Sequence, residues 1–335
     1  MLSFITWDVD PEAFTILGRE VRWYGILWAL GVLLTTMVIQ RMYKWEKLPE
    51  KWFDSLFMHV IFGLIIGARL GHCLFYTPLE YLASPIDLIK IWEGGLASHG
   101  GAIGMVVGVC LYSLKITNKK INWRYVLIGS VSGFIIGGLA GYLTSASSVD
   151  ANLGLAFLGL SVGLCVALLF TVYPTAVQTL DKLVVGVAIG ATFIRLGNLM
   201  NHEIYGGPTD LPWAFRFIEN LHEWKKGAEP IYSQPSHPTQ IYEALTYFII
   251  FLVGMFLFYK TKAREKTGLI LGISLIGIFL SRFIYEFIKN TQEDYESDMI
   301  LNMGQLLSLP FIIWGIWLIW SALKRPLKVE KIKSK

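Results

Sequence analysis

Charged residues are scarce in this chain of 335 residues, because Asp, Glu, Lys and Arg make up only 16% of it while 54% is hydrophobic. A mean hydropathy of +0.52 lies outside the range of ordinary soluble domains and excludes a single soluble core. The modest net charge of +4 gives no reason to expect a nucleic-acid partner. The composition predicts a polytopic membrane protein whose medium is the lipid bilayer.

Cysteine is also scarce. Cys73, Cys110 and Cys165 all fall inside apolar runs, and none belongs to a CxxC pair. We therefore expect packing residues rather than a disulfide framework or a thiolate metal site.

His202 and Glu203 lack the second histidine of a zinc-protease HExxH helix, and neither a metal nor another cofactor is expected. The first residues lack a basic segment and an early cleavage site, so no removable signal peptide is expected.

Long apolar runs, by contrast, are abundant. A helical span needs about 20 mostly apolar residues, and the sequence predicts an all-α membrane protein with nine spans. They lie at roughly 21–42, 52–76, 97–116, 125–146, 153–173, 183–200, 239–259, 268–288 and 302–323. We expect residues 1–335 to form a single transmembrane domain.

Lysine and arginine gather in the loops on one side of these spans. They follow the first, third and seventh spans and recur in the tail KRPLKVEKIKSK. Because cytoplasmic loops are enriched in these residues, the pattern predicts an outside N-terminus and a cytoplasmic C-terminus. Two long connections then lie outside. Residues 77–96 suit an interfacial helix, and the proline-rich residues 201–238 predict a small extracytoplasmic cap with short strands.

The fourth span carries a stripe of glycines at i+4 spacing, made by Gly129, Gly133, Gly137 and Gly141. Small residues on one face allow two transmembrane backbones to approach closely. The stripe therefore predicts helix packing and carries no chemistry.

Four ionisable residues lie inside or at the rim of apolar runs: Arg69, His99, Arg195 and Arg282. A charge at mid-bilayer costs about 2.5–3.5 kcal/mol on insertion scales, and such residues usually mark a substrate site or an ion path. The chemistry is therefore expected within the membrane boundary.

His99 lies in the segment SHGGAIG, residues 98–104, at the outer end of the third span. An imidazole with an ordinary pKa near 6.5 can accept a proton or donate to phosphate oxygens. The adjacent glycines can leave the backbone open to a lipid head group. A histidine that is hydrogen-bonded between helices explains the residue equally well, so both interpretations stay open.

Arg195 lies in FIRLGNLMNHEIYGG, residues 193–207, where Arg195, Asn198 and His202 are spaced to share one helix face. Arginine suits phosphate because it offers a planar fork of donors and stays charged when partly desolvated. Glu203 and Gly206 follow at the mouth of the predicted cap. The alternative is an arginine that only extends to the membrane interface.

Two later segments add polar groups near the same surface. In SHPTQIYEAL, Tyr242 and Glu243 either orient a neighbouring charge or belong to a structural helix start. In SRFIYEFIKNTQED, Arg282 and Glu286 are i,i+4 neighbours, with Lys289 one turn further outward. An ion pair alone would be a structural explanation. Two arginines on spans that end at one surface, however, predict a divided clamp for the phosphate of an anionic lipid.

Near the start of the chain, VRWYGILWAL places Arg22 and Tyr24 at the same surface.

The chain resembles the prolipoprotein diacylglyceryl transferase family in seven blocks, in family order and across nearly its whole length. The blocks are VRWYGI, GARLG, EGGLASHGG, RLGNLMNHEIYG, HPTQIYEA, SRFIYEF and LNMGQLLSLP.

The resemblance implies a transferase of the bacterial cytoplasmic (inner) membrane with a catalytic site near the outer leaflet. Such an enzyme moves the diacylglyceryl group of phosphatidylglycerol to the thiol of the lipobox cysteine in a prolipoprotein signal peptide. A thioether forms and glycerol phosphate leaves, as the first step of lipoprotein biosynthesis.

The resemblance also implies roles for individual residues. His99, Arg195 and Arg282 match the family's functional histidine and arginines and are the expected catalytic residues. Tyr24, Asn198, Glu203 and Gly206 match further functional positions, and substrate contacts are expected from these four and from Arg69, Tyr242, Glu286 and Lys289. The arginines would hold the phosphate. His99 would serve either as the base for the cysteine thiol or as a lipid ligand.

Several departures from the family pattern stand out. Lys289 stands where many members carry a second arginine, and the usual Pro-Asp after it is missing. Ile194 and His202 stand where glycine is common. About fifty extra residues separate the HGG block from Arg195. We expect residues 125–175 to form a two-helix hairpin inserted among seven family helices, at the periphery of the site.

An anion transporter is the rival class, because buried arginines also serve translocation. Transporters typically show two related halves with broken helices, and the sequence shows no such symmetry. A membrane transferase for another lipid-linked substrate is the rival among enzymes. It would be expected to show a carboxylate pair or a metal-binding Asp cluster on an outer loop, and the acidic run at 293–298 is poorly placed for that role.

Overall fold

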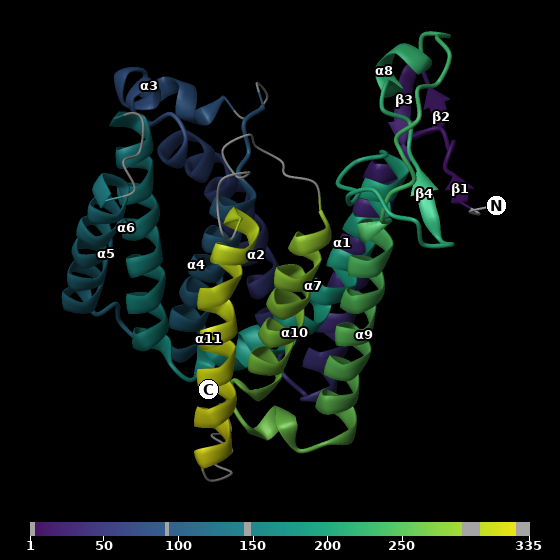
Figure 1. The fold of residues 1–335 in the computed structure, drawn as a ribbon. Helices are drawn as coiled ribbons and strands as arrows, with labels where there is room; N and C mark the ends of the chain where they lie inside the picture. Colours follow the sequence, from purple (N-terminus) through teal and green to yellow (C-terminus); the bar gives the residue numbers. More distant parts are fainter. Residues whose placement is uncertain (1–3, 91–93, 144–148, 290–301, 326–335) are drawn as a thin grey trace. The chain divides into compact units, whose positions relative to one another are not determined.

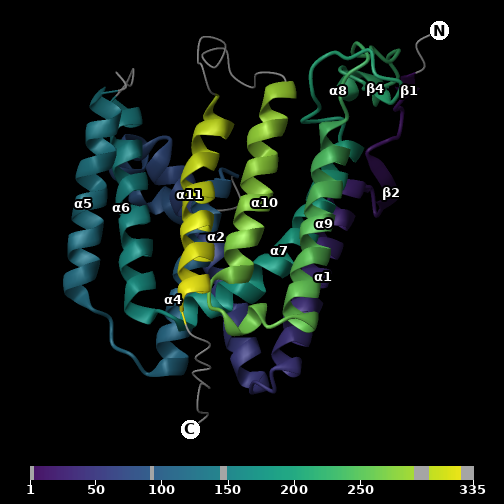
Figure 2. The same ribbon diagram turned by 60° about the horizontal axis from the view of Figure 1, so that its bottom comes forward.

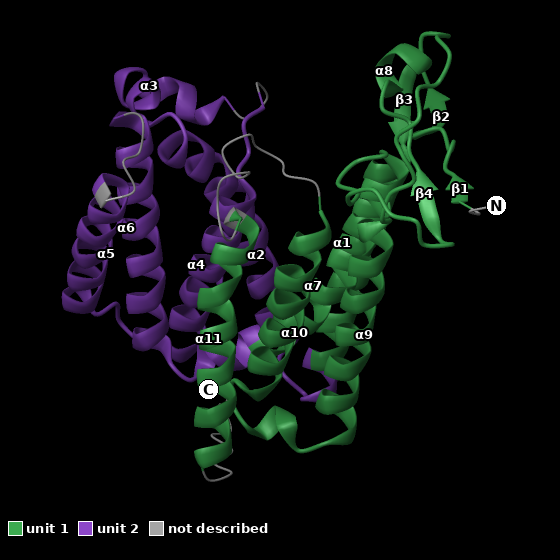
Figure 3. Ribbon diagram, viewed as in Figure 1, with its two compact units in different colours: residues 1–42, 181–333, 335 green, residues 43–180, 334 purple. Residues whose placement is uncertain are grey.

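The computed structural model describes residues 4–90, 94–143, 149–289 and 302–325. The chain forms two compact units, shown in Figure 3: unit 1 holds residues 1–42 together with 181–333, and unit 2 holds residues 43–180. Long helices dominate both units, so the all-α prediction is confirmed. The acidic run at 293–298 and the basic tail from residue 326 onward lie outside the described residues.

Within the described residues, nine helices are long and apolar enough to cross a membrane. They are α1 (Trp23–Trp45), α2 (Glu50–Phe75), α4 (Ser98–Thr117), α5 (Trp123–Leu143), α6 (Val149–Val172), α7 (Thr175–Met200), α9 (Thr239–Lys260), α10 (Leu269–Tyr285) and α11 (Met303–Lys324), as labelled in Figure 1. A short helix, η4 (Glu286–Ile288), continues α10. The nine spans predicted from the apolar runs are confirmed.

The largest difference from the expected spans is at α7, which begins at Thr175 instead of near residue 183. Polar residues before position 183 do not interrupt this helix. Asp181 is only 5% exposed. Its carboxylate accepts hydrogen bonds from the backbone N–H groups of Gly268 and Leu271, both at 2.7 Å. These donors lie at the start of α10, where a helix has unpaired N–H groups. Asp181 thus joins α7 to α10.

Glycine seams join the helices of unit 2. A Cβ at Gly104 of α4 would overlap the Gly63 carbonyl oxygen of α2, and a Cβ at Gly133 of α5 would overlap the Gly159 oxygen of α6. Figures 1 and 2 both show α5 and α6 side by side. Only glycine allows backbones to approach so closely. The predicted packing role of the α5 stripe is confirmed, and the α2–α4 seam was not predicted.

Helix α6 also packs against α2 and α4. A Cβ at Gly154 of α6 would overlap the Phe75 carbonyl oxygen at the end of α2. The other helix of the pair, α5, exposes large apolar side chains such as Trp123, Leu127 and Ile136. Exposed apolar side chains on a spanning helix suit contact with lipid tails.

Unit 1 packs its helices through both small and aromatic residues. Between α1 and α7, the Thr35 hydroxyl donates to the Gly186 carbonyl oxygen at 2.7 Å. Between α10 and α11, the rings of Phe279 and Phe311 stack with their centroids 4.2 Å apart. Figure 2 shows these two helices running alongside each other.

The cap of unit 1 combines residues 201–238 with the beginning of the chain. Strand β1 (Phe4–Thr6) pairs in parallel with β4 (Ala214–Arg216), and β2 (Glu12–Ile16) pairs with β3 (Arg19–Arg22) in an antiparallel hairpin. A short helix, α8 (Leu221–Trp224), follows β4. Phe217, with no exposed surface, packs with Leu199 and Phe215 in the cap core. Short strands were expected in 201–238, but the contribution of the N-terminal residues was not.

The described part of the connection between α2 and α4 contains two short helices, α3 (Pro78–Ala83) and η1 (Pro85–Ile89), where one interfacial helix was expected. Proline at position 85 starts the second helix. Ile86 and Ile89 are both 68% exposed. The interfacial character expected of residues 77–96 stays a prediction.

Candidate active site

Arg195 lies on α7 with its side chain 17% exposed. Its Nε lies 2.6 Å from Oε2 of Glu243 on α9, and its Nη1 donates to Oδ1 of Asn198 at 3.2 Å. The three-residue spacing thus places Arg195 and Asn198 on one helix face, as the sequence predicts. Partners on two sides fix the orientation of the guanidinium.

Glu203 follows the end of α7 and continues this network. Its Oε1 accepts hydrogen bonds from Nδ2 of Asn198 at 2.8 Å and of Asn201 at 3.3 Å. Its backbone oxygen accepts from Nε2 of Gln240 at 2.8 Å, at the start of α9. The amide of Asn198 therefore bridges the guanidinium of Arg195 to the carboxylate of Glu203.

His202 departs from the helix face that it was expected to share with Arg195 and Asn198. Helix α7 ends at Met200, and His202 adopts a positive φ of 55°. Its Nδ1 accepts a hydrogen bond from the Ile218 N–H at 3.1 Å, so Nε2 carries the proton and donates to the Val9 oxygen at 2.9 Å. Burial lowers the pKa of His202, partly opposed by Asp8 and Asp10. His202 is a structural residue of the cap.

Gly206 lies where the cap begins, and only glycine fits there. A Cβ would lie 2.6 Å from the Ile288 oxygen and 2.8 Å from the Cβ of His237. Gly206 also forms an isolated antiparallel bridge with Lys289, and the next N–H, of Gly207, donates to the Ile288 oxygen at 2.8 Å. Gly206 therefore ties the cap to the end of the α10 segment that carries Lys289.

Lys289 is buried between two carboxylates, with its side chain 5% exposed. Its Nζ lies 2.8 Å from Oε1 of Glu243 and 3.2 Å from Oε1 of Glu286. Glu243 is itself fully buried. The ion pairs form one chain that runs from Arg195 through Glu243, Lys289 and Glu286 to Arg282. Four of the predicted site residues are thereby brought together.

Arg282 is the most accessible of the three cations in this series of ion pairs, with its side chain 37% exposed. Its Nε lies 3.7 Å from Oε1 of Glu286 and is buried without a hydrogen-bond partner. Oε2 of Glu286 accepts instead from Nδ2 of Asn302 at 3.3 Å. The guanidinium of Arg282 is therefore held loosely by its carboxylate, and its donors suit an incoming anion.

Aromatic side chains surround the network. The Tyr242 hydroxyl accepts from Nε1 of Trp213 at 2.9 Å, which joins α9 to the cap. The ring of Tyr24 lies against the bare backbone of Gly197, where a Cβ would come within 2.8 Å of Tyr24 Cδ2. Both tyrosines were predicted to contact substrate, and those contacts stay predictions.

His99 belongs to unit 2, where it is exposed on the first turn of α4. The expectation that its neighbouring glycines leave the backbone open to a ligand is wrong. Gly100 is buried in the α2–α4 seam, where a Cβ would overlap the Gly67 oxygen, and a Cβ at Gly101 would meet Leu64. These glycines serve close helix packing. The convergence of His99 with the arginines would join the two units and stays a prediction.

Arg69 of unit 2 is 4% exposed and binds the connection between α2 and α4. Its guanidinium donates to the backbone oxygens of Leu88 at 3.1 Å, Gly94 at 2.6 Å and Asp87 at 2.6 Å, and it lies 5.3 Å from the ring centre of Tyr81. These contacts satisfy a buried charge and hold Tyr81, Asp87, Leu88 and Gly94 against α2. Its predicted contact with substrate stays untested.

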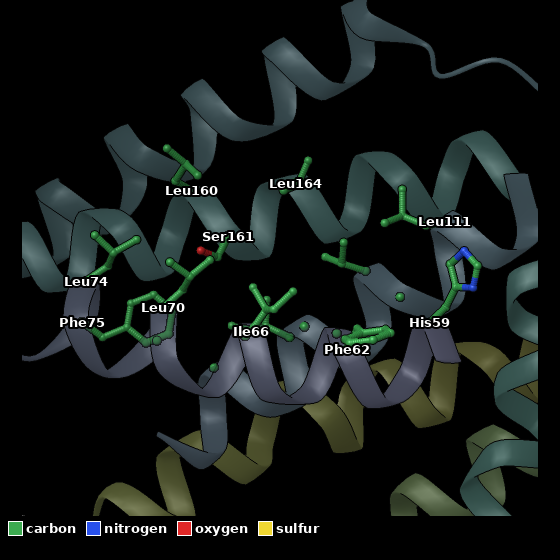
Figure 4. Close-up of a pocket in the computed structure, with 18 of the residues that line it drawn as sticks. His59, Phe62, Ile66, Leu70, Leu74, Phe75, Leu111, Leu160, Ser161 and Leu164 are labelled. Carbon is green, nitrogen blue, oxygen red and sulfur yellow. The ribbon is translucent and has the colours of Figure 1, made fainter. Parts of the chain in front are cut away.

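Unit 2 also contains an apolar cavity of about 650 Å³, lined by α2, α4 and α6. Figure 4 shows Phe62, Ile66 and Leu70 on one side, Leu160 and Leu164 on another, and His59 at one end. Its one hydroxyl, from Ser161, already donates to the Phe157 oxygen at 2.9 Å. Nδ1 of His59 lies 2.6 Å from the Ser55 oxygen, and the mainly apolar lining suits hydrocarbon.

Two members of the network were not singled out as substrate residues from the sequence. Glu243 was expected to orient a charge or to cap a helix, and the structure places it between Arg195 and Lys289. Asn302 was missed. Its side chain and that of Gln305 form a capping box at the start of α11, and the Asn-Met-Gly-Gln spacing is a sequence signal for that motif.

The cysteines Cys73, Cys110 and Cys165 are free and buried, as expected of packing residues. In the described part of the chain, no group of three or more His, Cys, Asp or Glu side chains is arranged to hold a metal ion. The candidate chemistry therefore centres on the guanidinium and carboxylate groups of unit 1.

Comparison with known proteins gives one consistent family. The model of the prolipoprotein diacylglyceryl transferase family matches residues 11–145 and 125–321. This chain is 44% identical over 331 residues to a phosphatidylglycerol–prolipoprotein diacylglyceryl transferase of Porphyromonas gingivalis, covering 97% of both chains. It is 34% identical to that of Chloroherpeton thalassium, covering 96% of both, and 36% identical to that of Bacteroides fragilis, covering 95% of both.

Proposed function

Because the chain belongs to the prolipoprotein diacylglyceryl transferase family, we propose that it transfers the diacylglyceryl group of phosphatidylglycerol to prolipoproteins. It is a membrane transferase with nine candidate spanning helices in the described residues. The observation that carries the proposal from the structure is the chain of ion pairs in unit 1, which ends in the accessible guanidinium of Arg282. Such a group suits the phosphate of an anionic lipid.

The acceptor is the thiol of the lipobox cysteine in a prolipoprotein signal peptide. The thiol, with an ordinary pKa near 8.5, loses its proton to a base. The thiolate sulfur then forms a bond to the terminal glyceryl carbon of the diacylglyceryl group. The bond from that carbon to the phosphate oxygen breaks, its electron pair stays on the oxygen, and glycerol phosphate leaves.

Arg282 and Arg195 have different roles at the lipid phosphate. Arg282 binds the phosphate directly, because only a contact of 3.7 Å joins its Nε to Glu286. Arg195, oriented by Glu243 and Asn198, stabilises the negative charge that develops on the leaving oxygen. Preorganised donors in a water-poor site make the largest single contribution to many enzymatic rates.

His99 is the base that accepts the thiol proton in this proposal. Its exposure on the first turn of α4 supports access for a peptide substrate, and an imidazole has an ordinary pKa suited to proton transfer near neutral pH. Glu203 and Tyr24 help to position the glycerol of the lipid. Asn198 fixes the positions of the Glu203 and Arg195 side chains relative to each other through hydrogen bonds to both.

The site opens toward the outer leaflet of the bacterial inner membrane, with the N-terminus outside and the C-terminus in the cytoplasm. The basic loops after the first, third and seventh spans support this orientation. Prolipoprotein signal peptides cross from the cytoplasm, so their cysteines are presented to that outer surface.

Residues 125–175 form an inserted hairpin that leaves the site unchanged. The α5–α6 glycine seam supports a closely packed helix pair, and the family model matches the chain in two segments that overlap at residues 125–145. A variant in which a short linker replaces α5 and α6 is expected to retain transfer activity in membranes. Complete loss of activity in a normally folded deletion variant would refute the peripheral role.

The test of function uses the purified protein, phosphatidylglycerol and a lipobox peptide. Mass spectrometry is expected to find one diacylglyceryl unit added to the peptide cysteine and an equal amount of glycerol phosphate. A peptide with serine in place of that cysteine is the matched control and is expected to gain nothing. If the cysteine peptide also gains no mass while the lipid stays intact, the proposed function fails.

A further inference from the structure

Lys289 is a cation that the proposed mechanism does not use, although it lies within the same network. It follows η4 directly, is 5% exposed, and contacts two carboxylates at 2.8 Å and 3.2 Å. Because both contacts are carboxylates and the side chain is enclosed, Lys289 has little capacity left for a substrate phosphate. Its effect must therefore be exerted through its partners, Glu243 and Glu286.

The same two carboxylates are the ion-pair partners of the two arginines. Glu243 contacts Arg195, and Glu286 contacts Arg282. Without Lys289, two carboxylates would face two guanidinium groups, and the ion-paired set would carry no net charge. With Lys289, three cations face two carboxylates, so one positive charge remains. At the low effective dielectric constant of a partly buried site, one unit of charge changes the binding of an anion strongly.

We propose that Lys289 is a positioning residue that occupies Oε1 of Glu243 and Oε1 of Glu286 and so keeps Arg195 and Arg282 available to an anionic lipid phosphate. This inference rests on the proposed function. Oε1 of each carboxylate contacts Lys289. Oε2 of Glu243 is left for Arg195, and Oε2 of Glu286 accepts from Asn302. Lys289 thereby sets both the charge and the geometry of the phosphate site.

Lysine suits this position because it acts as a point charge. Its ammonium group has three donors that can reach two carboxylates on separate helices, whereas the planar fork of arginine favours one carboxylate held by two bonds. Glu243 comes from α9, and Glu286 follows α10. Lys289 therefore joins two elements that each present one carboxylate, and an arginine there is expected to do so with altered geometry only.

The experiment compares wild-type protein with Lys289→Met, Lys289→Arg and the double variant Lys289→Met/Glu286→Gln in phosphatidylglycerol vesicles with a lipobox peptide. Lys289→Met is expected to raise the KM for phosphatidylglycerol roughly tenfold or more and to change kcat by less than about threefold. Lys289→Arg is expected to stay within about threefold of wild type. The double variant restores the net charge and is expected to recover most of the lost affinity.

Lys260→Met is the matched control, because it removes one exposed positive charge at the end of α9 and is expected to leave the KM unchanged. An unchanged KM in Lys289→Met overturns the proposal. So does a KM in the double variant that is no lower than in the single variant. If Lys289→Met does not fold, the double variant decides alone, because it leaves no unpaired carboxylate: a KM near wild type supports the proposal and a raised KM overturns it. Failure of the wild-type protein to transfer diacylglyceryl would instead overturn the proposed function.

Discussion

The two units of this protein differ in how far they use charged groups to hold helices together in a membrane. Unit 2 joins α2 to α4 and α5 to α6 through glycine seams in which backbones touch. Unit 1 places buried ion pairs between α7, α9 and the end of α10. Lipid tails are as apolar as the helix surfaces, so association must come from close packing or from polar contacts. Unit 1 adds buried ion pairs to packing through small and aromatic residues, whereas unit 2 packs through its glycine seams.

The difference also separates structure from chemistry. The backbones in a glycine seam pack against each other, and no polar side chain is left there to bind a substrate. A network of charges in a poorly hydrated site leaves residual charge, as at Arg282, and the groups that hold the helices also prepare a binding site. In unit 1, the proposed recognition of lipid depends on residues that also hold helices together, so variants of the buried ion pairs should affect both. In unit 2, most variants should affect packing alone.

The largest expected effect is from Glu243→Gln in unit 1. The change leaves Lys289, which is 5% exposed, with one carboxylate and removes the ion-pair partner of Arg195. Breaking a buried ion pair costs about 3–5 kcal/mol, so thermal unfolding in detergent should occur at a clearly lower temperature, with loss of transfer. Glu219→Gln, at an exposed cap residue, is the control. Equal stability of the two variants would show that the network does not hold unit 1.

Arg282→Gln should separate activity from stability. The side chain is 37% exposed and only loosely paired with Glu286, so the unfolding temperature is expected to stay near that of wild type. The transfer rate at low phosphatidylglycerol is expected to fall by roughly 10- to 150-fold, because a hydrogen bond to a charged group such as the lipid phosphate contributes about 1.5–3 kcal/mol. Initial rates measured by mass spectrometry check this, and a wild-type rate would remove Arg282 from the mechanism.

The α2–α4 seam is tested by a pair of substitutions on one helix. Gly104→Ala places a methyl group on the Gly63 carbonyl oxygen, whereas Gly101→Ala meets the flexible end of Leu64 at 3.3 Å. The first variant should lose about 1–3 kcal/mol of stability, the usual cost of overpacking. The second should lose much less. Similar unfolding curves for both variants would mean that the seam tolerates separation of the two helices.

Two neighbouring glycines of α5 allow a further comparison of alanine substitutions, with a smaller expected difference in stability. A Cβ at Gly137 would overlap the Leu155 oxygen, but a Cβ at Gly138 would lie 3.8 Å from Ala156. Gly137→Ala should therefore loosen the α5–α6 pair. Gly138→Ala should stabilise it by up to about 1 kcal/mol, because alanine favours a helix over glycine. The rate at which a protease cleaves the connection between the two helices would measure the difference in stability between the two variants.

The smallest effect concerns the cap of unit 1 and depends on pH. Burial lowers the pKa of His202 in the folded protein, so its neutral form stabilises the cap above the ordinary pKa of about 6.5. That stability is lost as the pH falls below this value, because the unfolded state then binds the extra proton. Hydrogen exchange of the Ile218 amide, which donates to Nδ1, should accelerate in acid beyond its intrinsic trend. His202→Gln should abolish this dependence, and His222→Gln, at an exposed residue, should not.

The sequence was sufficient to predict the spans, the glycine stripe of α5 and the alignment of Arg195 with Asn198, because these depend on hydropathy and helical periodicity. Contacts between distant segments were harder to predict. Nothing in a local pattern joins Glu243 to both Arg195 and Lys289, which lie 48 residues before it and 46 after it in the chain. The glycines near His99 show a second difficulty. Glycine serves both ligand access and helix packing, and only the positions of Gly63 and Gly67 on α2 resolve which applies.

The most direct test measures how strongly the protein prefers phosphatidylglycerol to diacylglycerol, which lacks the phosphate. Wild-type protein is expected to retain phosphatidylglycerol at least about tenfold more tightly, and Arg282→Gln is expected to lose most of that preference while it still retains diacylglycerol. An unchanged preference in a folded Arg282→Gln protein would contradict recognition of the phosphate by the unit 1 network.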